Sequence, residues 1–133
     1  MNAHLFSFIQ SVCLLVLVVA VPACNALREV RAEERETNTK ADLRREVVSF
    51  AQQFKGTDYK AAGKTPKSGF DCSGFTGYVM RNFDIQLSAS SRDQAKQGRT
   101  IPLKEAKQGD LIFFRRSSTT PVFHVAMIVS NDR

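Results

Sequence analysis

One cysteine and one histidine stand out as a pair whose side chains could carry out nucleophilic chemistry. Cys72 follows a loop that contains Gly69, and His124 lies much later in the chain, inside a run of β-forming residues. A thiol needs a base to become the thiolate that attacks a carbonyl group, and imidazole titrates near neutral pH. A Cys–His pair of this kind is typical of papain-like acyl transfer. The alternative is a buried, unreactive cysteine and a core histidine.

The residues after Cys72 predict a helix that begins at the cysteine. Apolar side chains recur at helical spacing, at Phe75, Tyr78, Val79 and Phe83. The unpaired backbone N–H groups at a helix N-terminus favour a thiolate over a thiol. The same groups can stabilise the oxyanion of a tetrahedral intermediate. The sequence therefore places the candidate nucleophile where such donors are available.

Further periodic segments predict an α+β fold, with helices packed on an antiparallel sheet. Strands are expected over residues 111–115 and 122–129, and in the second His124 shares a face with alternate residues. A short helix capped by Ser90 or Ser91 is expected to run through Gln97. An earlier helix is expected to start near Thr39 and to end at Gly56; its apolar residues are Leu43, Val47, Phe50, Ala51 and Phe54.

Five motifs follow one another between Gly56 and Val129. They are Gly56-Thr57-Asp58-Tyr59, Phe70-Asp71-Cys72-Ser73-Gly74-Phe75, Leu87 with Ser91-Arg92-Asp93-Gln94, Gly109-Asp110-Leu111-Ile112-Phe113-Phe114, and His124-Val125-Ala126. In this order the motifs resemble those of the NlpC-type cell-wall peptidases, which are papain-like cysteine hydrolases of bacterial envelopes. The resemblance implies a papain-like α+β fold and hydrolysis of peptidoglycan stem peptides next to the γ-D-glutamyl residue, commonly before diaminopimelate.

The resemblance also implies roles for individual residues. Cys72 would be the nucleophile, and His124 the general base and then the general acid. Tyr59, Asp71 and Ser73 match positions beside the nucleophile and are candidates for binding the substrate. Core packing is the alternative for Tyr59, helix capping for Asp71, and a structural role in the first helical turn for Ser73.

The chain departs from the family pattern in three places. Ala62-Gly63 stand where the family has two glycines, and Ser88-Ala89 stand where it often has Pro-Arg, so that Arg92 would have to replace that arginine. The polar residue that orients the histidine usually lies on the strand after the His strand, and the sequence ends at Arg133. Asn131 lies in the intervening turn and receives no role. We therefore expect an incomplete sheet at this end and weak activity of the chain as given.

The N-terminal segment predicts export. Residues 1–23 carry no charged side chain and include an apolar run too short for a comfortable membrane span, which is typical of a signal peptide. Val21-Pro22-Ala23-Cys24 resembles a bacterial lipobox, which predicts lipidation of Cys24; ordinary cleavage after Ala23 or Ala26 is the alternative. Residues 24–38 are expected to form a charged tether, and residues 39–133 the peptidase domain. The predicted location is the periplasm or a membrane-anchored lipoprotein.

Composition limits the partners. The formal net charge is +6, and a basic chain suits an anionic polymer such as the cell wall. No nucleic-acid motif is visible, and one Cys and one His in the domain are too few for a structural metal site, so we expect neither nucleic acid, metal nor cofactor. Membrane contact is expected only through the lipid anchor. The alternatives to a peptidase are a catalytically weak or inactive wall-binding protein and a related thiol amidase or acyltransferase.

Overall fold

The computed structural model describes the backbone of residues 4–130 and the side chains of residues 25–130. Contacts divide the chain into two units, Met1–Ala41 and Asp42–Arg133. The elements in chain order are α1 (His4–Gln52), β1 (Lys64–Thr65), β2 (Gly69–Phe70), α2 (Cys72–Arg81), α3 (Ser91–Gln94), a 3₁₀ helix (Leu103–Glu105), β3 (Leu111–Phe114) and β4 (His124–Met127).

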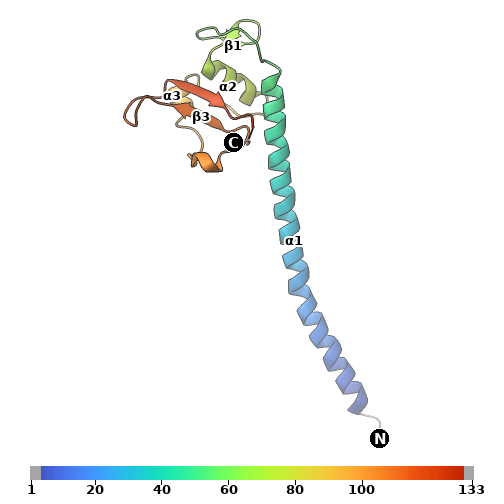
Figure 1. Ribbon diagram of the computed structural model, residues 1–133. Coiled ribbons are helices and arrows are strands. Elements are labelled where there is room, and N and C mark those ends of the chain that lie inside the picture. The colour runs from blue at the N-terminus through green and yellow to red at the C-terminus, as the bar shows by residue number, and fades with distance from the viewer. Residues whose placement is uncertain (1–3, 131–133) are drawn as a thin grey trace. The chain divides into compact units, whose positions relative to one another are not determined.

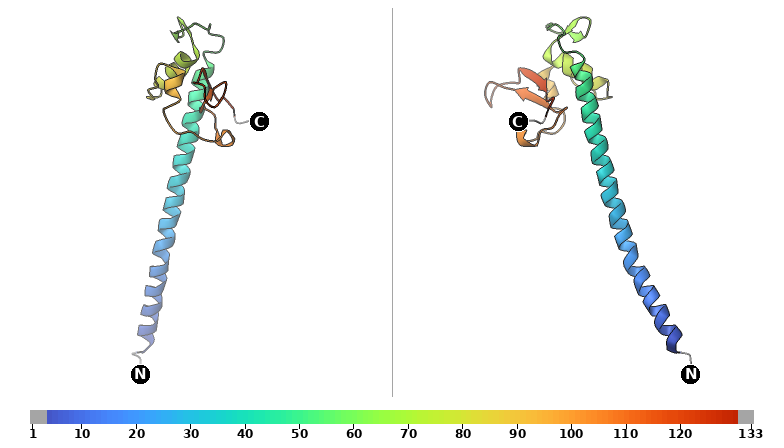
Figure 2. Two further views of the ribbon diagram at one scale, coloured as in Figure 1. Left: turned by 90° about the vertical axis from the view of Figure 1, so that its left-hand side faces the viewer. Right: turned by 45° about the vertical axis from the view of Figure 1, so that its right-hand side comes forward.

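Helix α1 runs without a break through the predicted tether, residues 24–38 (Figures 1 and 2). The predicted helix start near Thr39 is wrong, because the Thr39 hydroxyl donates to the carbonyl of Arg35, 2.8 Å away in the preceding turn. Residues 26–36 consist mainly of strong helix formers, so the helix does not need a new cap there. Lys40 donates a 2.6 Å hydrogen bond to Glu36, and this bond and the Lys40 charge lower the pKa of Glu36.

The lipidation prediction concerns Cys24, whose side chain lies outside the described residues. Residues 1–3 also lie outside them, so the signal-peptide assignment rests on the sequence alone. Within the described part of the chain, no helix combines the length and apolar content needed to cross a membrane.

The hydrophobic core of the second unit joins the last turns of α1 to α2. Val47 and Ala51 from α1 are buried with Val79 and Met80 from α2. Rings surround this centre in edge-on or stacked contacts, at Phe50, Phe54, Phe70, Phe75, Tyr78 and Phe83. Leu43, expected on the apolar face, is 45% exposed instead. The last turns of α1 thus anchor the helix that carries Cys72.

A short antiparallel hairpin, absent from the sequence prediction, precedes α2. Strands β1 and β2 pair Lys64 with Phe70 and Thr65 with Gly69. The turn between them is closed by hydrogen bonds between Thr65 and Ser68, including one of 2.8 Å between the two hydroxyl groups. Two-residue strands are too short to show the alternation by which strands are found in a sequence.

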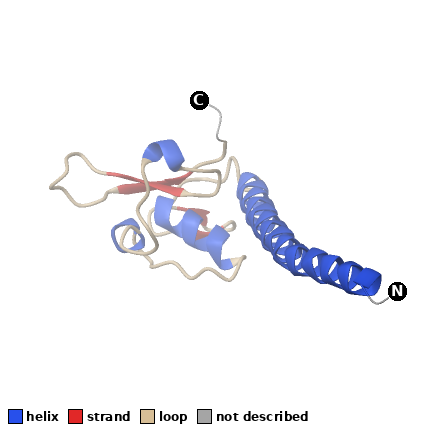
Figure 3. Cartoon of the chain, turned by 90° about the horizontal axis from the view of Figure 1, so that it is seen from below, coloured by secondary structure: helices blue, strands red, loops and turns tan. Residues whose placement is uncertain are grey.

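The second sheet pairs β3 with β4 in the antiparallel register Phe114↔His124 to Leu111↔Met127. Pairing extends past β3, because Gly109 N–H donates to Ile128 O at 2.7 Å. Arg44 of α1 binds the Asp110 carboxylate at 2.5 Å, which fixes the Gly109-Asp110 turn to the helix. Helix α2 contacts β4, and Figure 3 shows helix and strands adjacent, with the connection between β3 and β4 projecting beyond the strand ends.

Candidate active site

Cys72 is the first residue of α2, as the sequence predicts, and Asp71 is the N-cap. The Asp71 carboxylate accepts the Gly74 N–H at 2.6 Å, so the capping role considered for Asp71 is confirmed. The Ser73 hydroxyl lies 3.0 Å from the same Asp71 oxygen and 3.1 Å from the carbonyl oxygen of Ala89. Ser73 is buried, so its hydroxyl serves these internal contacts.

Two backbone N–H groups at the start of α2 have no hydrogen-bond acceptor among the described residues. Gly74 N–H is taken by the Asp71 side chain, and Phe75 N–H donates to the Asp71 carbonyl at 2.9 Å. Among the described residues, the N–H groups of Cys72 and Ser73 have no acceptor. The Cys72 thiol is free and half-buried. A thiol beside two free N–H groups is suited to attack a carbonyl carbon, because these groups can donate hydrogen bonds to the oxyanion that forms.

The start of α2 is packed tightly against the backbone of the preceding loop. The Gly63 carbonyl accepts the Asp71 N–H at 3.0 Å. A Cβ atom added to Gly74 would lie only 2.0 Å from that same carbonyl oxygen. Ala62, which replaces the first glycine of the family pair, has φ +59°, a left-handed conformation that glycine adopts more easily. A Cβ atom at Gly63 would collide with the backbone carbonyl of Gly69, so both glycine positions of the family pattern have a geometric reason.

His124 is the first residue of β4 and is exposed. Its neighbour Val125 is only 2% exposed, so the predicted alternation places the imidazole on the face away from the core. The His124 ring lies 5.7 Å from the ring of Phe114. In the part of the chain described, no side chain forms a hydrogen bond with the imidazole, and Asn131 lies outside that part. The contact between α2 and β4 makes the elements of Cys72 and His124 neighbours.

Tyr59 lies on the rim of this region. Its backbone forms a parallel bridge with Phe70, two residues before the cysteine. The side chain is 73% exposed, so the core-packing alternative for Tyr59 is wrong. Because its backbone pairs with the loop that precedes Cys72, the exposed Tyr59 phenol is available to a substrate near the nucleophile. Arg92, in the exposed face of α3, is likewise free of the core.

Thr76 and Gln94, the two most fully buried polar side chains near the site, have no role predicted from the sequence. Thr76 has no exposed surface and Gln94 is 1% exposed. Gln94 ends α3, which is shorter than the predicted helix through Gln97; of the two predicted caps, Ser90 is the N-cap and accepts the Asp93 N–H. Lys96 and Ser90 hold the pKa of Asp93 below its ordinary value, mainly through the Lys96 hydrogen bond. The motif Ser91-Arg92-Asp93-Gln94 separates Gln94 from the nearby Gln97 in the sequence, but it indicates neither the burial of the Gln94 side chain nor its partners.

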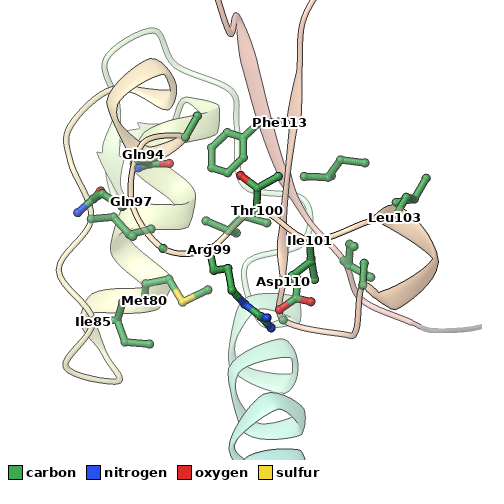
Figure 4. A pocket seen from close by; sticks show the side chains of 18 of the residues that line it. Met80, Ile85, Gln94, Gln97, Arg99, Thr100, Ile101, Leu103, Asp110 and Phe113 are labelled. Atoms are coloured by element: carbon green, nitrogen blue, oxygen red, sulfur yellow. The ribbon is translucent and has the colours of Figure 1, made fainter.

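A hollow of about 820 Å³ opens elsewhere on the same unit (Figure 4). Gln94, Gln97 and Met80 line one side, and Phe113, Ile101 and Leu103 lie across from them. Cys72 and His124 do not line it. The chemistry assigned to the Cys–His pair therefore does not take place in this hollow.

Comparisons with known proteins agree on one family. Residues 56–133 match the NlpC/P60 family. The chain is 39% identical over 105 residues to the gamma-DL-glutamyl hydrolase of Bacillus subtilis strain 168, an alignment that covers 78% of this chain and 25% of the relative. It is 39% identical over 83 residues to the probable endopeptidase NlpC of Escherichia coli strain K12, covering 62% of this chain and 53% of the relative.

A solved structure supports the fold. A Staphylococcus aureus Mu50 protein, described as similar to a lipoprotein of the NLP/P60 family, superposes with a TM-score of 0.60 at 33% identity, over 68% of this chain and 32% of its own. The papain-like α+β fold class predicted from the sequence is confirmed. The chain spans a quarter of the length of the first of these two curated relatives and about half the length of the second.

Proposed function

The chain belongs to the NlpC/P60 family of cysteine peptidases, and from this premise we propose that it hydrolyses peptide bonds in the peptidoglycan stem, next to the γ-D-glutamyl residue. The observation that carries the proposal is the position of Cys72 at the capped start of α2, beside two unspent N–H groups, on a helix that contacts the strand of His124. The names of two relatives, a gamma-DL-glutamyl hydrolase and a probable endopeptidase, support the same chemistry.

In the proposed mechanism His124 takes the proton of the Cys72 thiol. The thiolate adds to the scissile carbonyl, and the resulting oxyanion accepts hydrogen bonds from the N–H groups of Cys72 and Ser73. His124 then gives its proton to the leaving amine, and the C–N bond breaks to leave a thioester on Cys72. Water, deprotonated by His124, hydrolyses this thioester and restores the free thiol.

We assign the substrate contacts to the exposed rim of the site. We expect Tyr59 to touch the stem peptide; its exposed side chain and the pairing of its backbone with Phe70 support this assignment. Asp71 and Ser73 act mainly by holding the start of α2, since their side chains bind each other and Asp71 caps the helix. Any direct contact of these two residues with the peptide stays a prediction, as does the replacement of the family's arginine by Arg92.

A wall-binding protein without strong catalysis is the second candidate, and one observation favours it. Within residues 25–130, the His124 ring has no hydrogen-bond partner to hold it in the productive tautomer. In papain-like sites such a partner keeps one ring nitrogen facing the thiol. Catalysis would then be weak while the surface around Tyr59 still bound the wall.

The test uses purified protein and soluble muropeptides released from cell walls by a muramidase. We expect products that end in γ-D-glutamate and products that begin with diaminopimelate, identified by mass spectrometry. Products cut at the D-alanyl cross-link would contradict the assigned bond. Retention of the protein on intact sacculi without any cleavage would favour the wall-binding candidate.

We also propose that the protein is exported and anchored by a lipid on Cys24. Support comes from the apolar residues before Val21-Pro22-Ala23-Cys24 and from the description of the Staphylococcus aureus neighbour as similar to a lipoprotein. Mass spectrometry of the envelope fraction should find a diacylated Cys24 at the N-terminus, and the Cys24→Ser protein should leave the membrane fraction. An unmodified N-terminus at Leu27 would contradict the anchor.

A further inference from the structure

The Gln94 side chain joins α3 to the first turn of the helix that carries the nucleophile. Its Nε2 group donates to the Ser73 carbonyl at 3.0 Å and to the Ser88 carbonyl at 2.9 Å. Its Oε1 atom accepts the Thr76 hydroxyl at 2.9 Å. The amide thus binds two points of α2 and one point of the loop before α3, while being almost fully buried.

The orientation of this amide is determined by its partners. Two backbone carbonyls face Nε2, and carbonyls can only accept, so the nitrogen and oxygen cannot be exchanged. Both hydrogens of the amide are used, and its oxygen has a donor. A fully satisfied buried polar network restricts its members to one arrangement, because each lost bond leaves a desolvated group. Ser73, next in the chain to Cys72, is held twice, since its hydroxyl also lies 3.1 Å from Ala89 O.

We propose that Gln94 is a positioning residue for the nucleophile: its hydrogen bonds to Ser73 and Thr76 hold the first turn of α2 so that the Cys72 thiol and the two unspent N–H groups keep their mutual geometry. The inference rests on the proposed function for its effect on turnover. The expected effect of Gln94 on the reactivity of the Cys72 thiol toward an alkylating reagent does not depend on that function. Displacement of a reacting group by about 1 Å lowers rates by about 10²-fold.

Gln97 provides a matched control within the same segment. It accepts the Ser88 N–H at 2.8 Å and donates to the Gln86 carbonyl at 3.2 Å. Its side chain is exposed and forms no bond with α2. Gln97 therefore holds the same loop as Gln94 without holding the nucleophile helix, and the two glutamines separate loop support from nucleophile positioning.

The variant Gln94→Met keeps the approximate shape of the side chain and removes its hydrogen bonds. It should fold, because the Thr76 hydroxyl can turn to the Cys72 or Ser73 carbonyl, each 3.2 Å away. We expect kcat for muropeptides to fall by about 10- to 10²-fold with KM within about twofold, and alkylation of Cys72 by iodoacetamide to slow by a similar factor. Gln97→Met should change kcat, KM and the alkylation rate by less than about twofold, whereas loss of nucleophile positioning would lower kcat by about 10-fold or more.

Alkylation separates this inference from the proposed function, because it needs no peptidoglycan substrate. Equal alkylation rates in Gln94→Met, Gln97→Met and the unchanged protein would overturn the positioning role, whether or not muropeptides are cleaved. If Gln94→Met does not fold, Gln94→Glu replaces it. A buried carboxyl regains one donor only when protonated, so its alkylation rate relative to the unchanged protein should rise as the pH falls from about 8 to about 5. A ratio independent of pH would overturn the proposal.

Discussion

Replacement of Cys72 by alanine is expected to lower muropeptide cleavage by about 10⁴- to 10⁶-fold, the range seen when the nucleophile of a hydrolase is removed. The thiol sulfur forms the covalent bond to the substrate, and no other described side chain next to the start of α2 can replace it. The measurement is the rate of product formation from soluble muropeptides, followed by chromatography.

The control for this prediction is Cys24→Ser, which removes a thiol from the chain and leaves Cys72 in place. Its cleavage rate in detergent-solubilised protein should equal that of the unchanged protein. His124→Ala should slow the alkylation of Cys72 as well as cleavage, because the imidazole takes the thiol proton. Cleavage by Cys72→Ala at a rate near that of the unchanged protein would show that the nucleophile is misassigned.

The local features of the site could be predicted from the sequence because they depend on neighbours in the chain. The spacing of Phe75, Tyr78 and Val79 indicates a helix, and Asp71 before it is a typical N-cap. The strand predicted over residues 111–115 is found at 111–114, and the one predicted over 122–129 is found at 124–127, shorter at both ends. In each case a short segment contains its own signal.

The features that were missed depend on distant partners. The motif that contains Gln94 does not indicate that its side chain is buried, because this burial depends on the approach of α3 to α2. The hairpin of β1 and β2 is too short to show a period. Thr39 has the residue type of a helix cap, but a preceding stretch of helix formers gives its hydroxyl a carbonyl to bind instead. Local propensity cannot decide between such alternatives.

Gly74→Ala should destabilise the domain by about 3 kcal/mol or more. The added methyl group would lie 2.0 Å from the Gly63 carbonyl oxygen, and neither atom can rotate away, because the oxygen belongs to the backbone and a Cβ atom is fixed by its own backbone. Moving Gly63 aside would also break the 3.0 Å hydrogen bond that its carbonyl accepts from Asp71 N–H, which lowers the free energy of unfolding by a further ~1 kcal/mol. The measurement is the free energy of unfolding in urea.

Gly77→Ala is the matched control, one turn later in the same helix. A Cβ atom there meets only Gln94 Nε2, at 3.8 Å, which is an ordinary contact. Because alanine restricts the unfolded chain and favours helix, this variant should be stabilised by about 0.5–1 kcal/mol. Equal stabilities of the two variants would contradict the close approach of Gly63 and Gly74.

The contact between α2 and β4 also sets the order in which the proposed chemistry becomes available during synthesis. A chain made from its N-terminus contains Cys72 and its whole helix well before His124 has been added. Until β4 exists and docks, the thiol has its helix but no base. In the growing or unfolded chain, the Cys72 thiol therefore has no base to deprotonate it, and it becomes an activated nucleophile only when the fold is complete. If the proposed activity holds, the unfolded chain should therefore cleave no peptide bonds before β4 has docked on α2.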